Sequence, residues 1–319
     1  MKKSLRRLWL PGQAPNNSMQ RTALRAAADA GRYANQNDSR RYSKKRITMT
    51  NRDSGFQLRG EGPEAYERYM VPIHCMDLAE DLIDRVGLRP REQVLDVACG
   101  TGIVSRYAAQ RVGTLGHVTG VELNPAMIEV ARHAAAYFDQ IEFLEGSALE
   151  LPVPDAHFDA VMCQQAIMFF PDREQAVRQM YRALKPGGRV GLDVFRTPEF
   201  VPSFAYLIEA LEKHAGPSAA DFMRAPFVMK SAAEMRALFE QAGFVDIEVL
   251  IRVGTLRYPS VEHLVRYETL NIPEPEIHTR QVQNALTREM EALAEGNLDD
   301  HGVVFSVQQF VVVAGRPVA

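Results

Sequence analysis

The sequence contains no run of eighteen or more apolar residues, so it predicts no membrane-spanning helix. Cysteine is also scarce: Cys75, Cys99 and Cys163 are too few and too far apart for a disulfide framework or a zinc knuckle. This scarcity is typical of a reducing compartment and predicts a cytoplasmic protein. No spacing of histidines, cysteines and carboxylates suits a metal ion, and we expect no metal site.

Positive charge is scarce outside the N-terminal segment. Residues 1–50 contain twelve Lys or Arg against Asp29 and Asp38, whereas the remaining residues contain 25 basic and 38 acidic side chains, a net charge of −13. An acidic body repels nucleic-acid phosphates and anionic bilayer surfaces. The sequence therefore favours a small-molecule partner over nucleic acid, and it contains no feature that sets an oligomeric state.

Residues 1–48 differ in composition from the rest of the chain. They are rich in Asn, Gln, Ser and Arg and have no sustained apolar period, so they bury too little apolar surface to offset the entropy of ordering them. A targeting segment, or a stretch upstream of a natural start at Met49, are the alternatives. We expect a disordered basic extension at 1–48 and one folded domain at 49–319.

A short apolar run at 94–97 leads directly into a turn of small residues. Gly100 and Gly102 allow the backbone to approach a ligand and to adopt positive φ. Residues 103–112 have helical composition, so the stretch predicts a strand, a glycine turn and the start of a helix. This is how a doubly wound sheet receives a nucleotide-like ligand at the carboxyl end of a strand, where Asp96 lies.

A second predicted strand, at 117–122, ends in a carboxylate. Glu122 follows Gly102 by twenty residues, the spacing at which an acidic side chain meets a ribose. Dinucleotides and S-adenosylmethionine both carry that ribose, so spacing alone does not separate an oxidoreductase from a methyltransferase. Ser105 occupies the third position of the dinucleotide fingerprint, where glycine or alanine is expected.

Three further blocks follow in order. A strand at 141–144 leads to Ser147, a Phe158-Asp159 pair opens a strand that ends near Gln164, and a Lys-Pro-Gly-Gly turn at 185–188 precedes a fifth strand at 189–195. A helix at 232–242, a sixth strand at 244–253 and a last strand at 303–313 complete the pattern.

Together these blocks resemble the class I S-adenosylmethionine-dependent methyltransferases, in particular the branch that includes ubiquinone and menaquinone C-methyltransferases. The resemblance covers about residues 62–255. It implies an α/β, doubly wound (Rossmann-like) sheet of seven mostly parallel strands with the last strand antiparallel, and S-adenosyl-L-methionine as cofactor. The positions that it implies for cofactor binding are Tyr66, Asp96, Ala98, Gly100, Thr101, Gly102, Glu122, Leu123, Met127, Ser147, Ala148 and Gln164. Ala98 departs from the family's first glycine, and Ser147 replaces a frequent aspartate.

Two segments, about 197–230 and 259–301, are insertions relative to this pattern. Both follow strands that end at the cofactor edge of the sheet, so we expect helical insertions that form a lid over the acceptor. The first is crowded with large apolar side chains, namely Phe195, Phe200, Phe204, Tyr206, Phe222, Met223, Phe227 and Met229. The expected acceptor is therefore a small apolar or aromatic molecule.

Methyl transfer from a sulfonium is an in-line displacement that requires positioning more than acid–base groups. A base is needed only if the acceptor loses a proton, and His74, His157 and His214 are the candidates, although histidines more often pack or lie exposed. Residues 64–86 show two helical patterns, the first broken at Pro72. His74 is the one to test first, because it follows Tyr66 and Tyr69 on the segment that the resemblance implies as a cap over the cofactor. The alternatives are a nicotinamide-dependent oxidoreductase and a catalytically inactive S-adenosylmethionine-binding module.

Overall fold

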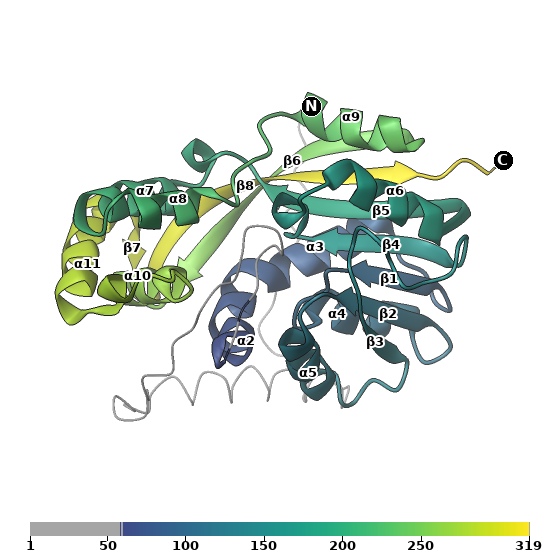
Figure 1. Cartoon of the computed structure of the whole chain (residues 1–319), viewed down its shortest axis with the longest axis horizontal. Coiled ribbons are helices and arrows are strands. Elements are labelled where there is room, and N and C mark those ends of the chain that lie inside the picture. The colour runs from purple at the N-terminus through teal and green to yellow at the C-terminus, as the bar shows by residue number, and fades with distance from the viewer. Residues whose placement is uncertain (1–57, 59, 319) are drawn as a thin grey trace, which may run out of the picture. The chain divides into compact units, whose positions relative to one another are not determined.

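The computed structural model describes residue 58 and residues 60–318. Their centre is one sheet with the strand order β3-β2-β1-β4-β5-β8-β6 (Figure 1). The strands are β1 Gln93–Val97, β2 His117–Glu122, β3 Ile141–Glu145, β4 Phe158–Gln164, β5 Leu184–Phe195, β6 Val245–Tyr258 and β8 Gly302–Gly315. The predicted extension at 1–48 lies outside the described residues.

Strands β1 to β5 pair in parallel, and β8 pairs antiparallel with both β5 and β6. The predicted doubly wound sheet with an antiparallel last strand is confirmed. A two-residue strand, β7 (Leu298–Asp299), pairs with β8 and was not predicted, because two residues have no detectable period.

Helices cover both faces of the sheet. On one face α3 (Met76–Val86) and α4 (Ile103–Val112) pack against Val94 and Met162, while on the other α6 (Arg173–Ala183) and α9 (Ala232–Ala242) pack against alternate residues of the same strands. Helix α5 (Pro125–Ala134) flanks β2 and β3. The strands therefore present apolar side chains on both faces, as buried parallel strands do.

The segment before β1 differs from the prediction. Helix α2 (Gly62–Ala65) continues through a π-helix, η2 (Tyr66–Cys75), into α3, and Pro72 lies inside η2 without breaking it. In an α-helix a proline ring collides with the carbonyl four residues earlier, and the wider π turn relieves this collision. The expected break at Pro72 is therefore wrong.

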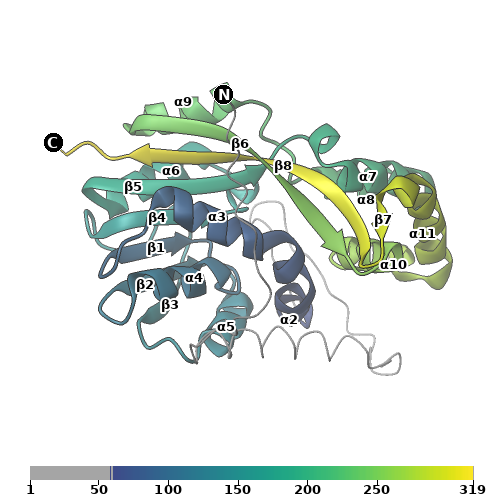
Figure 2. The ribbon, with the colours of Figure 1, turned by 180° about the vertical axis from the view of Figure 1, so that it is seen from behind.

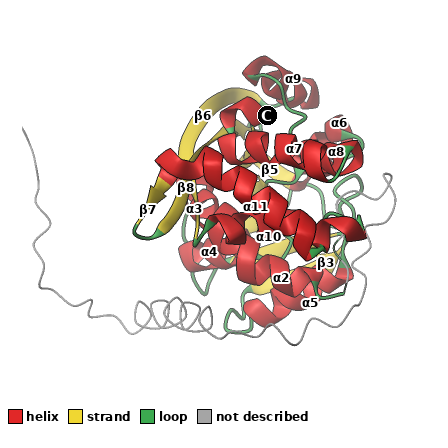
Figure 3. Cartoon of the chain, turned by 90° about the vertical axis from the view of Figure 1, so that its left-hand side faces the viewer, coloured by secondary structure: helices red, strands yellow, loops and turns green. Residues whose placement is uncertain are grey.

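The two insertions form a helical layer at the end of a long ribbon. Strands β6 and β8 extend together beyond the sheet, which is why both outrun their predicted ends, and they curve toward that layer (Figure 2). Its helices are α7 (Pro202–His214), α8 (Pro217–Arg224), α10 (Val261–Thr269) and α11 (Arg280–Ala294). Helix α11 lies against α7 and α10 (Figure 3), so the two insertions, distant in sequence, pack as one layer. Within the described part of the chain, no helix is long and apolar enough to cross a membrane.

Gly191 of β5 provides a test of how closely α3 packs on the sheet. A Cβ at this position would lie 2.2 Å from Val86 Cγ2 and 3.1 Å from Leu82 Cδ1. We expect Gly191→Ala to lower the free energy of unfolding by about 1–3 kcal/mol through overpacking, measured by urea denaturation. Gly296→Ala, where a Cβ meets open space, is the matched control and should change little. Equal stability of the two variants would contradict this packing.

Candidate functional site

A pocket lies at the carboxyl ends of β1, β2 and β4, and the turn after β1 forms its floor. The backbone of this turn is left-handed at alternate residues: φ is +56° at Ala98, +55° at Gly100 and +81° at Gly102. Helix α4 begins immediately after Gly102. Alanine has only a methyl side chain and adopts a left-handed backbone at a modest steric cost. Ala98 can therefore stand where the family has its first glycine.

Asp96 is buried beneath this turn, at the end of β1. Ser105 Oγ donates a hydrogen bond of 2.6 Å to Asp96 Oδ2, and burial raises the pKa of the Asp96 carboxyl to about 7. The partnership explains the serine at position 105: a glycine or alanine there would leave this buried carboxyl oxygen without its hydroxyl donor.

Glu122, at the end of β2, joins two turns. Its Oε2 accepts the backbone N–H of Gly100 at 3.0 Å, and its Oε1 accepts the backbone N–H of Asn124 at 2.9 Å. Burial raises the pKa of the Glu122 carboxyl, opposed by these N–H donors. Asn124 in turn caps α5 and donates from Nδ2 to the Leu58 carbonyl at 2.8 Å.

The structure brings most of the predicted cofactor residues together. The pocket is lined by Tyr66, Asp96, Ala98, Gly100, Thr101, Glu122, Leu123, Met127, Ser147, Ala148 and Gln164. Gly102 lies outside the lining: it faces Phe143, whose Cζ would lie 2.9 Å from a Cβ at position 102. Gly102 thus serves the packing of the turn, and its predicted contact with the cofactor stays a prediction.

The far end of the pocket is apolar and is supplied largely by the insertions. Of the eight large apolar residues predicted for the acceptor, Phe195, Phe204, Phe222 and Met223 line the pocket. Phe227 and Met229 are buried in the core instead. Phe200 lies beneath the Arg196 guanidinium, and Tyr206 packs edge-on against Phe305, because some aromatic residues must anchor the insertion to the ribbon.

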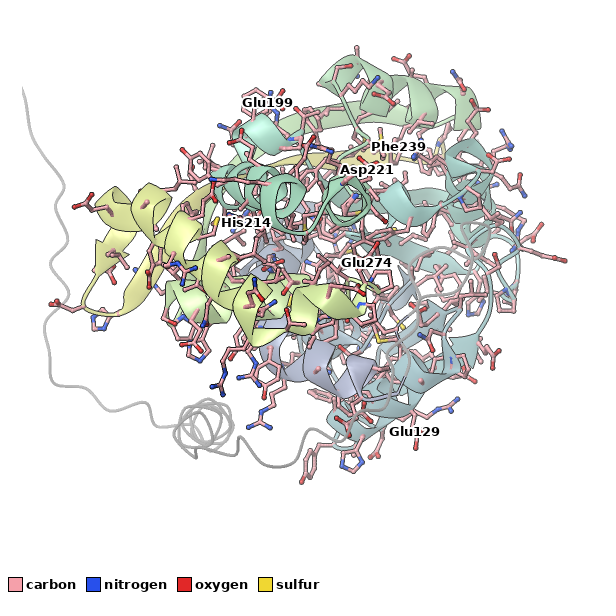
Figure 4. The ribbon with its side chains drawn as sticks, turned by 60° about the vertical axis from the view of Figure 1, so that its left-hand side comes forward. Glu129, Glu199, His214, Asp221, Phe239 and Glu274 are labelled. Atoms are coloured by element: carbon pink, nitrogen blue, oxygen red, sulfur yellow. The ribbon has the colours of Figure 1, made fainter. Side chains whose placement is uncertain are left out.

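The three candidate histidines have different surroundings. His74 lines the pocket and is buried, with Nε2 2.7 Å from Glu268 Oε1. His157 is exposed, and His214 pairs with Glu289 of α11, 2.5 Å from Nε2 to Oε2, in the helical layer (Figure 4). Neither lines the pocket, so the structure retains only His74 of the three.

Two lining residues of the second insertion, Glu268 and Asn271, were missed. A signal existed for Glu268: Val261, Leu264, Val265 and Glu268 follow the i, i+3, i+4, i+7 spacing of a buried helix face. A carboxylate on such a face has to meet a partner. One partner, Tyr258, lies ten residues earlier, but the other, His74, lies 194 positions away, and sequence spacing does not show that contact.

Comparison with known proteins identifies the family. A family model described as a methyltransferase domain matches residues 95–192. Demethylmenaquinone methyltransferase of Staphylococcus aureus is 30% identical over 175 residues, which cover 51% of this chain and 72% of that protein.

Solved structures show the same fold. The YcgJ protein of Bacillus subtilis is 20% identical, with a TM-score of 0.53, and the match covers 75% of this chain and 97% of that one. Phosphoethanolamine N-methyltransferase 2 of Haemonchus contortus, in complex with phosphomonomethylethanolamine and S-adenosylhomocysteine, is 19% identical with a TM-score of 0.53; the match covers 80% of this chain and 57% of that one.

The sheet order, the glycine turn and the carboxylates that end β1 and β2 define a nucleotide-type site on a methyltransferase fold. The chain belongs to the class I S-adenosylmethionine-dependent methyltransferases, as its sequence blocks predicted, and S-adenosyl-L-methionine is its cofactor.

The raised pKa of Asp96 makes a prediction about stability. Between about pH 4 and pH 7 the folded state holds a proton that the unfolded state has lost, so this group lowers stability as pH rises. Asp96→Asn removes this proton-binding group. We expect its stability relative to the unsubstituted protein to improve by about 1–3 kcal/mol from about pH 4 to about pH 8, measured by urea unfolding across that range.

Asp159 provides a control of opposite sign. Although burial opposes the effect, the Gln93 N–H and the Lys185 ammonium lower the pKa of Asp159. Ionised Asp159 stabilises the folded state at neutral pH, and this stabilisation is lost as pH falls. Asp159→Asn should therefore lower the free energy of unfolding most at about pH 8 and least at low pH. A flat difference for Asp96→Asn would contradict a buried, proton-binding carboxyl.

Proposed function

We propose that the protein transfers a methyl group from S-adenosyl-L-methionine to a small apolar or aromatic acceptor. The observation that carries this proposal is the apolar chamber in which Phe195, Phe204, Phe222 and Met223 continue the cofactor pocket. Phe169 and Phe170, after β4, line the same pocket. Aromatic walls of this kind favour a planar, apolar ligand and displace water from the reaction site.

The charges at the pocket support the same acceptor class. Asp96, Glu122 and Glu268 line it, whereas no Lys or Arg is among its described lining residues. A phosphorylated or nucleic-acid acceptor would meet carboxylates without a cation to pair with, at a cost in desolvation. The relative from Staphylococcus aureus is named for demethylmenaquinone, and a quinol has the flat apolar shape that such walls accommodate.

The described residues fit the cofactor. Thr101 Oγ1 is buried at the pocket and has no hydrogen-bond partner in the described part of the chain, so a ligand can supply one. Glu122, held by the turns on both sides, faces the pocket as a hydrogen-bond acceptor for ribose hydroxyls. When bound, the cofactor supplies a methyl group activated on a sulfonium, a cation that the nearby carboxylates favour.

The catalytic task left to the protein is alignment. In-line transfer needs the acceptor atom, the methyl carbon and the departing sulfur on one line, and water competes for the same space. The two insertions are joined by the contact of Ser218 with Glu274 and of His214 with Glu289, and both insertions contribute residues that line the pocket. We infer that the insertions form the substrate lid.

The role of Glu122 can be tested by calorimetry with S-adenosylhomocysteine. Removal of two hydrogen bonds to a charged group should weaken binding of this ligand by about 1–3 kcal/mol in Glu122→Ala. Glu145 ends the neighbouring strand, pairs in register with Glu122 and is exposed outside the pocket, so Glu145→Ala is the matched control. An unchanged dissociation constant in a folded Glu122→Ala variant would remove Glu122 from the cofactor site.

The acceptor class can be tested with quinols, phenols, amines, fatty acids and nucleotides, read as S-adenosylhomocysteine release. We expect turnover of the apolar aromatic compounds. Phe222→Ala should raise their KM about 10-fold to 100-fold, since loss of one aromatic contact removes about 1.5–3 kcal/mol of apolar burial. Phe200→Ala, in the same insertion but outside the pocket, should leave KM unchanged. Turnover of nucleotides alone would overturn the proposal.

A further inference from the structure

Three polar side chains from three separate elements meet at the apolar end of the pocket. His74 comes from η2, Tyr258 from the end of β6 and Glu268 from α10, and their exposed fractions are 8%, 0% and 7%. Glu268 Oε1 lies 2.7 Å from His74 Nε2 and 2.7 Å from the Tyr258 hydroxyl. Burial of three polar groups among aromatic rings is costly unless each has a partner, so their convergence calls for an explanation.

The hydrogen bonds assign the protons within this group. Burial, together with the adjacent Glu268, raises the pKa of Tyr258 well above its usual value, so its hydroxyl stays protonated and donates to Glu268. We assign the hydrogen of the neutral imidazole to His74 Nε2, because this nitrogen faces the same carboxylate oxygen. In that tautomer Nδ1 has a free lone pair, and no described residue forms a hydrogen bond with it.

His74 lies at the acceptor chamber, because it lines the pocket together with Phe195 and Phe204. Phe195 and Phe204, which line the chamber, meet the imidazole edge-on with centroids at 6.2 and 5.9 Å. The other ionisable groups near it are Tyr66 and Cys75 of η2, and burial raises the pKa of both, to about 12 for Cys75. Asp193 of β5 approaches Cys75 and is buried, and its pKa is raised to about 7.

Resting on the proposed function, we propose that the acceptor carries an aromatic hydroxyl and that His74 removes its proton. The O–H bond breaks, its electron pair stays on the acceptor oxygen and its ring, and the proton forms a bond to His74 Nδ1. The Glu268 carboxylate stabilises the resulting imidazolium and fixes the orientation of the ring, as in other His–carboxylate pairs. After product release the proton passes to solvent, and His74 returns to its starting tautomer.

His74 is thus a catalytic residue, while Glu268 and Tyr258 are positioning residues. Loss of a proton makes the oxygen, or the ring carbon beside it, a stronger nucleophile for a methyl group. The same pocket without a base would serve an acceptor that is already nucleophilic, such as a neutral amine. The His74 group therefore selects between acceptor classes that the apolar walls alone do not distinguish.

The proton transfer can be observed without turnover, with a chromogenic phenol as probe. 4-Nitrophenol and 7-hydroxycoumarin change their absorbance on ionisation, and each is titrated with the full-length protein saturated with S-adenosylhomocysteine. The pH is set where the free phenol is mostly protonated. We expect the bound phenol to ionise, with its pKa lowered by about one unit or more, which is at least a tenfold shift in the protonation equilibrium.

Variants distinguish His74 from its surroundings. His74→Gln should bind the phenol but lose the shift, and Glu268→Gln should retain part of it. His157→Gln, at an exposed histidine outside the pocket, is the control and should behave as the unsubstituted protein. Calorimetry with S-adenosylhomocysteine confirms that each variant is folded, and His74→Asn replaces His74→Gln if the latter is not.

The outcomes separate the two proposals. Ionisation of the bound phenol that is equal in His74→Gln and in the unsubstituted protein overturns the role of His74 alone, and so does binding without ionisation. If neither phenol binds while nucleotides are methylated, the apolar acceptor fails, and the base assignment fails with it. Methylation of phenols with a tenfold or greater loss of kcat in His74→Gln, at unchanged affinity for S-adenosylhomocysteine, supports both.

Discussion

The carboxylate of Glu122 is the contact on which the cofactor half of the pocket depends. It accepts one N–H from the turn after β1 and one from the start of α5, and so links two segments that the pairing of β1 with β2 brings close together. Asn124 extends the link to Leu58 at the start of the described chain. The Glu122 side chain therefore holds both turns of the pocket floor in place before any ligand contributes.

Much of this half was predictable because its signals are local. A strand, a left-handed turn that needs small residues and a helix start occupy consecutive positions. A glycine in such a turn, here Gly100, indicates a left-handed backbone directly from the sequence. Parallel pairing then brings Asp96, Glu122 and Gln164 to one edge without further information. Gly102 shows the limit of this reasoning, because a glycine required for packing against Phe143 is indistinguishable in sequence from one required by a ligand.

The acceptor half was predictable in composition but not in geometry. His74 and Glu268 are 194 positions apart, and their contact depends on how far β6 extends past the sheet and where α10 then lies. Pro72 was misread for a related reason: its usual effect on an α-helix does not apply to a wider π turn, and nothing local announces that turn. The His74–Glu268 contact and the π turn at Pro72 both depend on packing between segments, which the spacing of apolar residues along the sequence does not show.

The long ribbon also fixes where the second insertion begins and ends. Tyr258 and Val303 are register partners on β6 and β8, so the chain leaves the ribbon and returns to it at a single place. The segment between them, which includes the helix that carries Glu268, is closed at its base by this pair, and β7 within it adds a short pairing with β8. None of its residues belongs to β1, β2 or β4, the strands whose ends form the cofactor half of the pocket. The cofactor half and the helix that supplies Glu268 are therefore built from separate parts of the chain, and a change in the length of one leaves the strands of the other in place.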